Sequence, residues 1–168
     1  GTPETFCPGA VKIHVDIDPA EINKVFTMDC AIVGDAATVL RSLNEQLVPG
    51  DTAAWLAQID EWKEAYPLHY HKRGTFEAQY VIDELYHQTG GRAVVTTDVG
   101  QHQMWAAQWF RHSHPRHFIS SGGLGTMGFG LPASIGAKMG TPEKTVWCVD
   151  GDGGFQMTMH ELATIAQE

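Results

Sequence analysis

Residues 145–155 read T-V-W-C-V-D-G-D-G-G-F, a short apolar run that ends in a turn with a carboxylate set between glycines. The apolar run predicts a buried strand over 145–150, and the glycines mark the turn that follows it. Backbone N–H groups in such a turn can hold a diphosphate, and Asp152 can hold a divalent cation that bridges to it. The alternative is a tight turn in which Asp152 only caps a helix, and the turn alone leaves both open.

Two further strands precede this one, and each ends in a polar or glycine-rich turn. The strands are predicted at 93–99 and 118–121. Helices are predicted at 104–110, at 131–139 and from Thr158 onward, the last with a capping box formed by Thr158 and Glu161. Strands that alternate with helices predict a parallel sheet in an α/β fold. The turns at the carboxyl ends of parallel strands meet at one edge, so the pattern predicts one ligand site there.

The first 47 residues predict the end of a Rossmann-like domain. Residues 11–18 alternate apolar and polar side chains, which is typical of a strand, and a helix start follows at 18–21. A second short strand at 31–33 leads into helical spacing over 36–47. Residues 1–47 are therefore expected to form the C-terminal part of an α/β domain.

A connecting segment is predicted over 48–74. Aromatic residues recur at helical spacing over 55–66, which predicts a linker helix packed by its tryptophans. Residues 75–168 then form the front of a second α/β domain, which begins with a helix at 75–88 closed by Gly90-Gly91. The final helical pattern has no stop signal and the chain does not begin with Met, so the sequence predicts an internal fragment.

Composition and charge exclude several classes of protein. The 168 residues include 43% hydrophobic residues, as in a folded globular domain, and no stretch is apolar for long enough to span a membrane. The net charge is −9, from 11 Lys and Arg against 20 Asp and Glu, without the basic clusters that bind nucleic acid. Cys7, Cys30 and Cys148 are widely spaced, which fits a reducing compartment and inert thiols.

Three stretches resemble one enzyme family, in the order in which that family carries them. They are V-G-Q-H-Q-M-W-A-A-Q at 99–108, S-G-G-L-G-T-M-G-F-G-L-P-A at 121–133, and G-D-G-G-F at 151–155, which is followed by M-x-x-x-E-L-A-T. They resemble the catalytic subunit of acetohydroxyacid (acetolactate) synthase, a thiamine diphosphate enzyme, over nearly the whole chain. The resemblance implies that 1–47 end the family's central, FAD-binding domain and that 75–168 form the front half of its thiamine diphosphate-binding domain.

The resemblance assigns a thiamine diphosphate site residue by residue. Gly100, Gln101 and His102 would contact the diphosphate, since amide and imidazole groups donate hydrogen bonds to phosphate oxygens. The carbonyl of Gly125 would accept a hydrogen bond from the cofactor's 4′-amino group, and Met127 would wedge between its two rings. Both are thus expected to aid catalysis by positioning the cofactor. The other expected cofactor-binding residues are Thr126, Gly151, Gly153 and Gly154.

The resemblance also implies Mg²⁺ and FAD. Asp152 would ligate Mg²⁺ as a hard oxygen ligand. Asp16, Ile17 and Asp35 match positions at which the family contacts FAD. From the residues alone, Asp16 and Asp35 are expected to cap helices, and the two roles are compatible.

The resemblance implies decarboxylation of pyruvate and transfer of the two-carbon unit to a second 2-ketoacid, a step of isoleucine and valine biosynthesis. The products would be 2-acetolactate or 2-aceto-2-hydroxybutyrate. A catalytic Glu of another domain and a metal-binding Asn beyond Glu168 would be missing, so these residues alone are expected to be inactive. The implied partners are further copies in a homodimer or homotetramer and a small regulatory subunit. The implied location is the bacterial cytoplasm, with a plastid as the alternative.

Three other functions stay open. A related thiamine diphosphate 2-ketoacid carboligase or decarboxylase, such as glyoxylate carboligase, would share these motifs. A second alternative is an NAD-binding dehydrogenase, because 123–128 match G-x-G-x-x-G and Asp150 lies near a ribose-binding position. That fingerprint normally belongs to the first βαβ unit of its domain, whereas another strand precedes it here. The third is a non-catalytic binding module with a vestigial site.

Five histidines are set aside as metal ligands. His112, His114 and His117 form an H-x-H-x-x-H cluster that leads into the strand at 118–121. The cluster should therefore lie at the amino edge of the sheet, opposite the predicted site. His69 and His71 fall in a loop and are likewise not expected to bind a metal.

Overall fold

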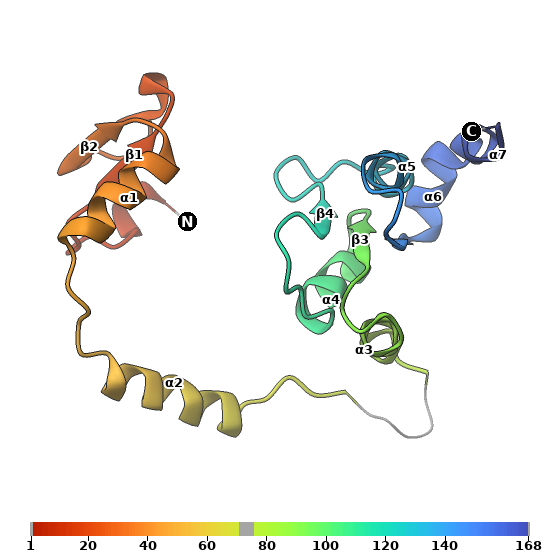
Figure 1. Ribbon diagram of the computed structural model, residues 1–168, viewed down its shortest axis with the longest axis horizontal. Coiled ribbons are helices and arrows are strands. Elements are labelled where there is room, and N and C mark those ends of the chain that lie inside the picture. The colour runs from red at the N-terminus through yellow and green to blue at the C-terminus, as the bar shows by residue number, and fades with distance from the viewer. Residues whose placement is uncertain (1, 71–75, 168) are drawn as a thin grey trace. The chain divides into compact units, whose positions relative to one another are not determined.

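The computed structural model describes residues 2–70 and 76–167, which form two compact units, Gly1–Pro67 and Leu68–Glu168. Each unit is built from parallel strands and helices (Figure 1). The elements of the first unit are the 3-10 turn η1 (Pro3–Thr5), β1 (Ile13–Asp16), the 3-10 turn η2 (Pro19–Glu21), β2 (Cys30–Val33), α1 (Ala36–Gln46) and α2 (Ala53–Ala65).

In the first unit, β1 and β2 pair in parallel, and carboxylates cap the elements that follow them. Asp18 accepts a hydrogen bond from the backbone N–H of Ala20 at 2.9 Å. Asp35 does the same for the N–H of Thr38, also at 2.9 Å, and so starts α1. Both predicted strands and α1 are confirmed, but the helix start at 18–21 forms only one 3-10 turn.

The apolar face predicted for the first strand is exposed within the described residues. Val11 is 78% exposed, Ile13 65% and Ile17 73%, and the strand spans only Ile13–Asp16. Alternation identifies a strand correctly, but two paired strands and one helix offer too little surface to bury that face. In α2, the rings of Trp55 and Trp62 pack edge to face with centroids 5.5 Å apart, as the aromatic stripe predicted, yet both remain about half exposed.

The second unit holds a three-stranded parallel sheet in the order β4-β3-β5. No helix in the ranges that the structure describes is long and apolar enough to cross a membrane. The elements are α3 (Ala78–Thr89), β3 (Val94–Thr97), α4 (Gln101–Trp109), β4 (Phe118–Ser120), α5 (Gly130–Gly140), β5 (Val146–Val149), α6 (Asp152–Thr158), the 3-10 turn η3 (Met159–Glu161) and α7 (Leu162–Gln167).

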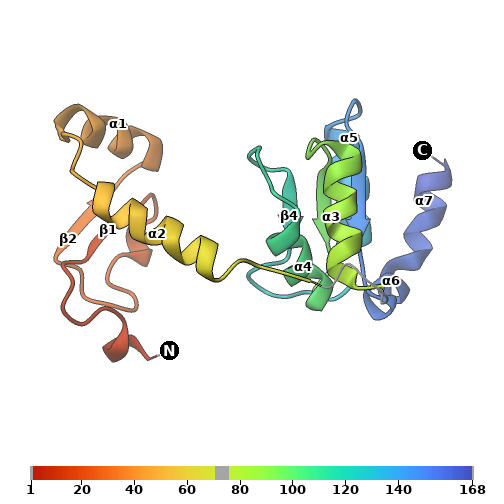
Figure 2. The ribbon, with the colours of Figure 1, turned by 90° about the horizontal axis from the view of Figure 1, so that it is seen from below.

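Helices cover both faces of this sheet, with α3 and α4 on one face of β3 and α5 on the other (Figures 1 and 2). Alternate residues of β3 point toward the helices on the two faces of the sheet. Val95 is fully buried against Ala106 and Phe110 on the side of α4. Thr96 faces the other side, where its hydroxyl donates to the carbonyl of Gly130 at 3.2 Å. Burial of each large apolar side chain contributes about 1.5–3 kcal/mol to the fold.

The ends of α3 agree only in part with the prediction. Gly90 and Gly91 close the helix with φ of 58° and 68°, a left-handed conformation that glycine adopts without strain. The helix begins at Ala78 rather than at residue 75. Thr75 and His71 lie outside the described residues.

Helical structure after Thr158 is confirmed by η3 and α7, but the predicted capping box is wrong. A helix already begins at Asp152, directly after Gly151, because an acidic residue in the first turn favours the helix N-terminus. Thr158 stands at the N-cap position of η3, but its side chain makes no capping hydrogen bond there, and its hydroxyl donates to the carbonyl of Gly128 at 3.3 Å instead. Glu161 accepts from the hydroxyl of Thr164 at 2.9 Å, so it does not complete the predicted box.

Candidate functional site

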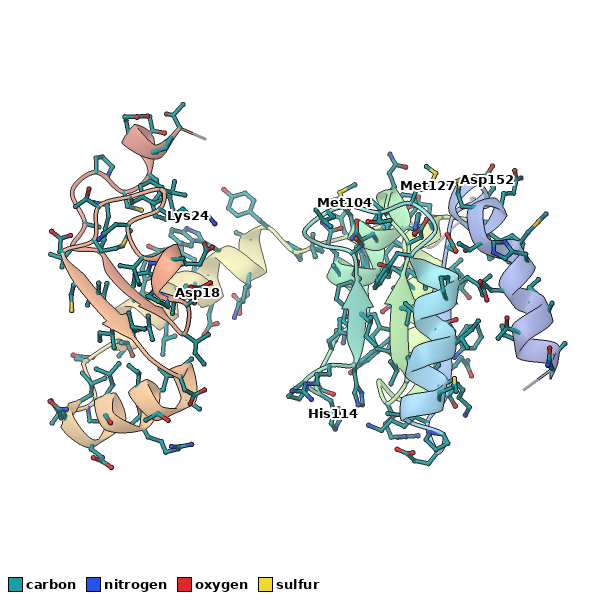
Figure 3. All side chains as sticks on the ribbon, turned by 90° about the horizontal axis from the view of Figure 1, so that it is seen from above. Asp18, Lys24, Met104, His114, Met127 and Asp152 are labelled. Carbon is teal, nitrogen blue, oxygen red and sulfur yellow. The ribbon has the colours of Figure 1, made fainter. Side chains whose placement is uncertain are left out.

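The three predicted turns lie together at the carboxyl edge of the β4-β3-β5 sheet. The central strand, β3, pairs in parallel with both neighbours, so all three strands end at the same edge. Figure 3 shows Met104, Met127 and Asp152 at one end of this unit and His114 at the opposite end. The convergence of the turns, and the placement of the histidine cluster away from them, are confirmed.

The turn after β3 holds the imidazole of His102 between two glycines. Gly100 has a φ of 154°, and a Cβ built on it would lie 3.0 Å from Cε1 of His102. A Cβ on Gly151 would lie 3.4 Å from the same atom. The Nε2 atom of His102 is buried and has no hydrogen-bond partner among the described residues. In the tautomer that carries the ring proton on Nε2, this nitrogen is a hydrogen-bond donor that no described group uses.

A hydroxyl network that the sequence analysis did not single out joins the first two turns. The amide nitrogen of Gln103 donates to Oγ of Ser120 at 2.6 Å. The hydroxyls of Thr97 and Ser120 lie 2.8 Å apart. These contacts hold the start of α4 and the end of β3 against the end of β4. Gln103 could have been noticed in the sequence, because it lies inside the motif at 99–108.

The glycine loop after β4 presents Gly125 and Met127 at the carboxyl edge. Gly125 has a φ of 65°, and its N–H donates to the carbonyl of Ser121 at 3.1 Å. The N–H of Thr126 donates to Oγ of the same serine at 3.0 Å. The side chain of Met127 is 56% exposed, although a methionine is usually buried. The loop thus holds an apolar side chain in contact with solvent, where a ligand can cover it.

Asp98 binds the helix N-terminus that a dinucleotide would use, and no local pattern in the sequence signals this role. Its side chain is 1% exposed. It accepts hydrogen bonds from the N–H groups of Gly128 at 3.0 Å, Phe129 at 2.8 Å and Gly130 at 3.3 Å. In an NAD-binding fold these first amides of the helix face the pyrophosphate. Because a carboxylate already occupies them, the geometry argues against the dehydrogenase alternative.

The Gly-Asp-Gly turn after β5 exposes one carboxylate and buries another. Asp152 is exposed at the first position of α6. Asp150 points inward, and its two oxygens are buried without a hydrogen-bond partner among the described residues. Burial raises the pKa of the Asp150 carboxyl, and the neighbouring charge of Asp98 raises it further. Asp150 is therefore not placed as an open ribose-binding acid, whereas Asp152 can reach a metal ion.

Gly154 lies against this carboxylate pair. A Cβ built on it would overlap the side chains of Asp98 and Asp150, so no larger residue fits there. Gly153, one position earlier, is exposed and has open space around its Cβ position. Both glycines are expected at the diphosphate. Gly153 is exposed to solvent, whereas position 154 requires a glycine because of its contact with the two carboxylates, whether or not a diphosphate binds.

The expected FAD residues lie in the first unit, at the carboxyl edge of its small sheet. Asp16 accepts from the N–H of Asp18 at 2.9 Å and lies 3.6 Å from Nε2 of His14. Ile17 is exposed, and Asp35 caps α1. The capping role expected from the residues is thus confirmed for Asp35.

The histidine cluster at the amino edge packs as part of the fold. Nε2 of His117 lies 2.6 Å from Nζ of Lys144, and the rings of His114 and His117 stack with centroids 4.8 Å apart. The ring of His112 lies between those of Phe110, at 4.9 Å, and Phe118, at 4.5 Å. No group of three or more His, Cys, Asp or Glu residues suited to a metal occurs among residues 2–70 and 76–167.

We predict that His112→Phe reduces the loss of stability in acid. Burial lowers the pKa of the His112 imidazole below its ordinary value of about 6.5. As the pH falls below that value, the unfolded chain takes up the proton more readily than the folded chain, so the free energy of unfolding decreases. Phenylalanine cannot take up a proton and suits the aromatic surroundings. Urea unfolding at neutral and mildly acidic pH measures the effect, with His160→Phe as a control because His160 is 73% exposed. Equal pH dependence in parent and His112→Phe would contradict the prediction.

Comparisons with known proteins agree with this geometry. Residues 98–168 match the family model "Thiamine pyrophosphate enzyme, C-terminal TPP binding domain", and residues 1–43 match "Thiamine pyrophosphate enzyme, central domain". The chain belongs to the thiamine pyrophosphate enzymes. Thiamine pyrophosphate is another name for thiamine diphosphate, so the family resemblance and the α/β fold inferred from the sequence are confirmed.

Within these thiamine pyrophosphate enzymes, the chain is similar to acetolactate synthases. It is 48% identical to the acetolactate synthase of Mycobacterium leprae over an alignment of 176 positions that covers all of this chain and 28% of that protein. It is 46% identical to the acetolactate synthase isozyme 3 large subunit of Escherichia coli over 96% of this chain and 30% of the relative. The Corynebacterium glutamicum large subunit is 45% identical over all of this chain. The chain thus spans 28–30% of the length of the first two relatives.

The carboxyl edge fits a diphosphate with its metal ion. Nε2 of His102 is an unpartnered buried ring nitrogen that can donate to a phosphate oxygen. Asp152 offers an exposed carboxylate of the type that Mg²⁺ prefers. Gly153 has an outward-facing position where a phosphate can approach the backbone closely. None of these three groups is a Lys or Arg, so the fit does not depend on basic side chains.

Proposed function

We propose that the chain is a segment of an acetolactate synthase, a transferase that decarboxylates pyruvate and passes the two-carbon unit to a second 2-ketoacid. The observation that carries the proposal is the single edge at which His102, the Gly125–Met127 loop and Asp152 come together, in a chain similar to proteins of that name. The products would be 2-acetolactate or 2-aceto-2-hydroxybutyrate, in isoleucine and valine biosynthesis. The proposed cofactors are thiamine diphosphate, Mg²⁺ and FAD.

The residues of this edge would hold and orient the cofactor. When bound, thiamine diphosphate supplies the carbon nucleophile and the electron sink needed to release carbon dioxide from pyruvate. Asp152 would hold Mg²⁺, and His102 would donate to the diphosphate. The Gly125 carbonyl would accept from the aminopyrimidine, and Met127 would support the bent cofactor. The remaining contacts would come from Gly100, Gln101, Thr126, Gly151, Gly153 and Gly154.

Further parts of the proposal concern partners and the first unit. The name "large subunit" of the Escherichia coli and Corynebacterium glutamicum relatives supports a small regulatory subunit as partner. We propose a homodimer or homotetramer in the bacterial cytoplasm. Residues 1–47 would end the central domain, 48–74 would connect it, and 75–168 would begin the cofactor-binding domain. Asp16, Ile17 and Asp35 would contact FAD.

Titration of the full-length synthase that carries this segment tests the proposal. Thiamine diphosphate is expected to bind only with Mg²⁺ present, and pyruvate is then expected to yield acetolactate. NADH serves as the comparison ligand. Binding of NADH without thiamine diphosphate would overturn the proposal in favour of a dehydrogenase, and binding of neither would favour a non-catalytic module.

We predict that the 168 residues alone form no acetolactate from pyruvate. Asp152 is one carboxylate, whereas Mg²⁺ needs near-octahedral oxygen coordination, and the family's catalytic Glu has no counterpart in this chain. A colorimetric acetolactate assay with saturating thiamine diphosphate and Mg²⁺ measures this, with the full-length protein as the positive control. Activity of the purified 168-residue chain would show that the site is complete within it.

A further inference from the structure

Asp98 is a buried carboxyl group whose hydrogen-bond donors are backbone amides. Its side chain is 1% exposed, and the carboxylate accepts from three successive N–H groups, those of Gly128, Phe129 and Gly130. These amides open α5, a helix of 11 residues, whose dipole also favours an anion at this end. A buried charge is costly without such partners. The carboxylate and the loop that supplies its donors are therefore stable only together.

The same loop carries the groups expected to touch the cofactor. It runs from Ser121, whose carbonyl accepts from the N–H of Gly125, to the start of α5, and it presents Met127 at the carboxyl edge (Figure 3). At its far end, the carbonyl of Gly128 accepts from the hydroxyl of Thr158. The loop is thus tied at its start by Ser121 and at its end by Asp98 and α6, with Met127 directly before the first amide that Asp98 binds.

Asp98 also reaches the Gly-Asp-Gly turn. The backbone of α6 passes so close to the carboxylate that a Cβ on Gly154 would overlap it. The residue stands directly after β3, the central strand, and its own N–H donates to the carbonyl of Val149 at 3.1 Å. One buried side chain on the central strand therefore contacts both of the turns that are expected to bind the cofactor.

We propose that Asp98 is a positioning residue that holds the 121–129 loop in its cofactor-accepting conformation before the cofactor arrives. Without the three amide contacts, the Gly125 carbonyl and Met127 would have to be ordered by the cofactor itself, and part of the binding free energy would be lost to that ordering. This inference rests on the proposed function, because it assumes that thiamine diphosphate is the ligand of the loop.

The test compares Asp98→Asn with Asp83→Asn in the full-length synthase. In Asp98→Asn an amide group faces the N–H of Gly128, whereas Asp83 is a second buried aspartate that lies on α3 and accepts from Tyr70 at 2.7 Å. For Asp98→Asn, the half-saturating concentration of thiamine diphosphate is expected to rise roughly 10–100-fold, as when an outer-shell partner of a bound group is removed. Turnover at saturating cofactor should stay close to that of the parent. Asp83→Asn should leave half-saturation unchanged.

Hydrogen–deuterium exchange of the full-length synthase, measured without cofactor, supplies a second readout. Peptides over 121–130 should exchange faster in Asp98→Asn, while peptides over 101–110 should not change. Parent-like exchange and half-saturation in Asp98→Asn would overturn the proposal, as would an equal effect of Asp83→Asn on half-saturation.

If Asp98→Asn does not fold, hydrogen–deuterium exchange of the unsubstituted protein tests the proposal instead. The amides of Gly128 and Phe129 must then be more protected than those of Gly122 and Gly123, and equal exchange would overturn it. Failure of the unsubstituted synthase to bind thiamine diphosphate would instead overturn the proposed function. The exchange measurement would still decide whether Asp98 holds the loop.

Discussion

Asp152→Ala is expected to abolish Mg²⁺-dependent binding of thiamine diphosphate in the full-length synthase while leaving the fold intact. The side chain is exposed at the first turn of α6 and adds no packing to the core, so its removal costs only the favourable interaction with the helix N-terminus, about 0.3–1 kcal/mol. The proposed metal site, in contrast, loses its one carboxylate ligand from this chain. The affinity for thiamine diphosphate is expected to fall by more than the roughly 10–100-fold that follows removal of a residue that only supports a metal ligand.

Calorimetric titration with and without Mg²⁺ measures this effect, and urea unfolding checks the fold. Asp60→Ala is a matched control, because it removes one negative charge from an exposed carboxylate on α2. Cofactor affinity of Asp152→Ala that keeps the parent's metal dependence would show that Asp152 is not the ligand.

Local sequence patterns predicted the sheet and the converging turns well. Each strand of the second unit is an apolar run bounded by polar or glycine residues, and such a pattern depends on neighbours in sequence. The same holds for the glycine cap at Gly90 and the carboxylate cap at Asp35. Strands that alternate with helices run parallel, and the turns at the carboxyl ends of parallel strands all lie at one edge of the sheet. The site at this edge was therefore predictable before any contact was known.

The features that sequence reasoning missed depend on contacts between distant residues. Asp98 meets the amides of Gly128 and Phe129 some 30 residues later, and nothing in its neighbourhood in sequence signals this. The capping box at Thr158 matched a local pattern, but a helix already begins at Asp152. The hydroxyl of Thr158 donates to the carbonyl of Gly128 instead. Tertiary packing decided both cases.

Gly154→Ala is expected to damage the site more than any other single methyl group added to its turns. The new Cβ would overlap the Asp98 and Asp150 carboxylates, which are already buried close together. Either α6 must move away from β3 or the carboxylates must leave their positions, and Asp98 would then release the amides of Gly128 and Phe129. Overpacking of this kind costs about 1–3 kcal/mol of stability and more where the neighbours cannot shift.

Gly153→Ala separates this steric effect from a general effect on α6. Its Cβ would meet nothing within 4 Å, and alanine in a helix is more favourable than glycine by up to about 1 kcal/mol. Urea unfolding should therefore show Gly154→Ala destabilised and Gly153→Ala at least as stable as the parent. In the full-length synthase, thiamine diphosphate affinity should also fall sharply for Gly154→Ala, because the displaced carboxylates no longer hold the Gly128 and Phe129 amides. If both variants were equally stable, close packing on the carboxylate pair would not explain the glycine at 154.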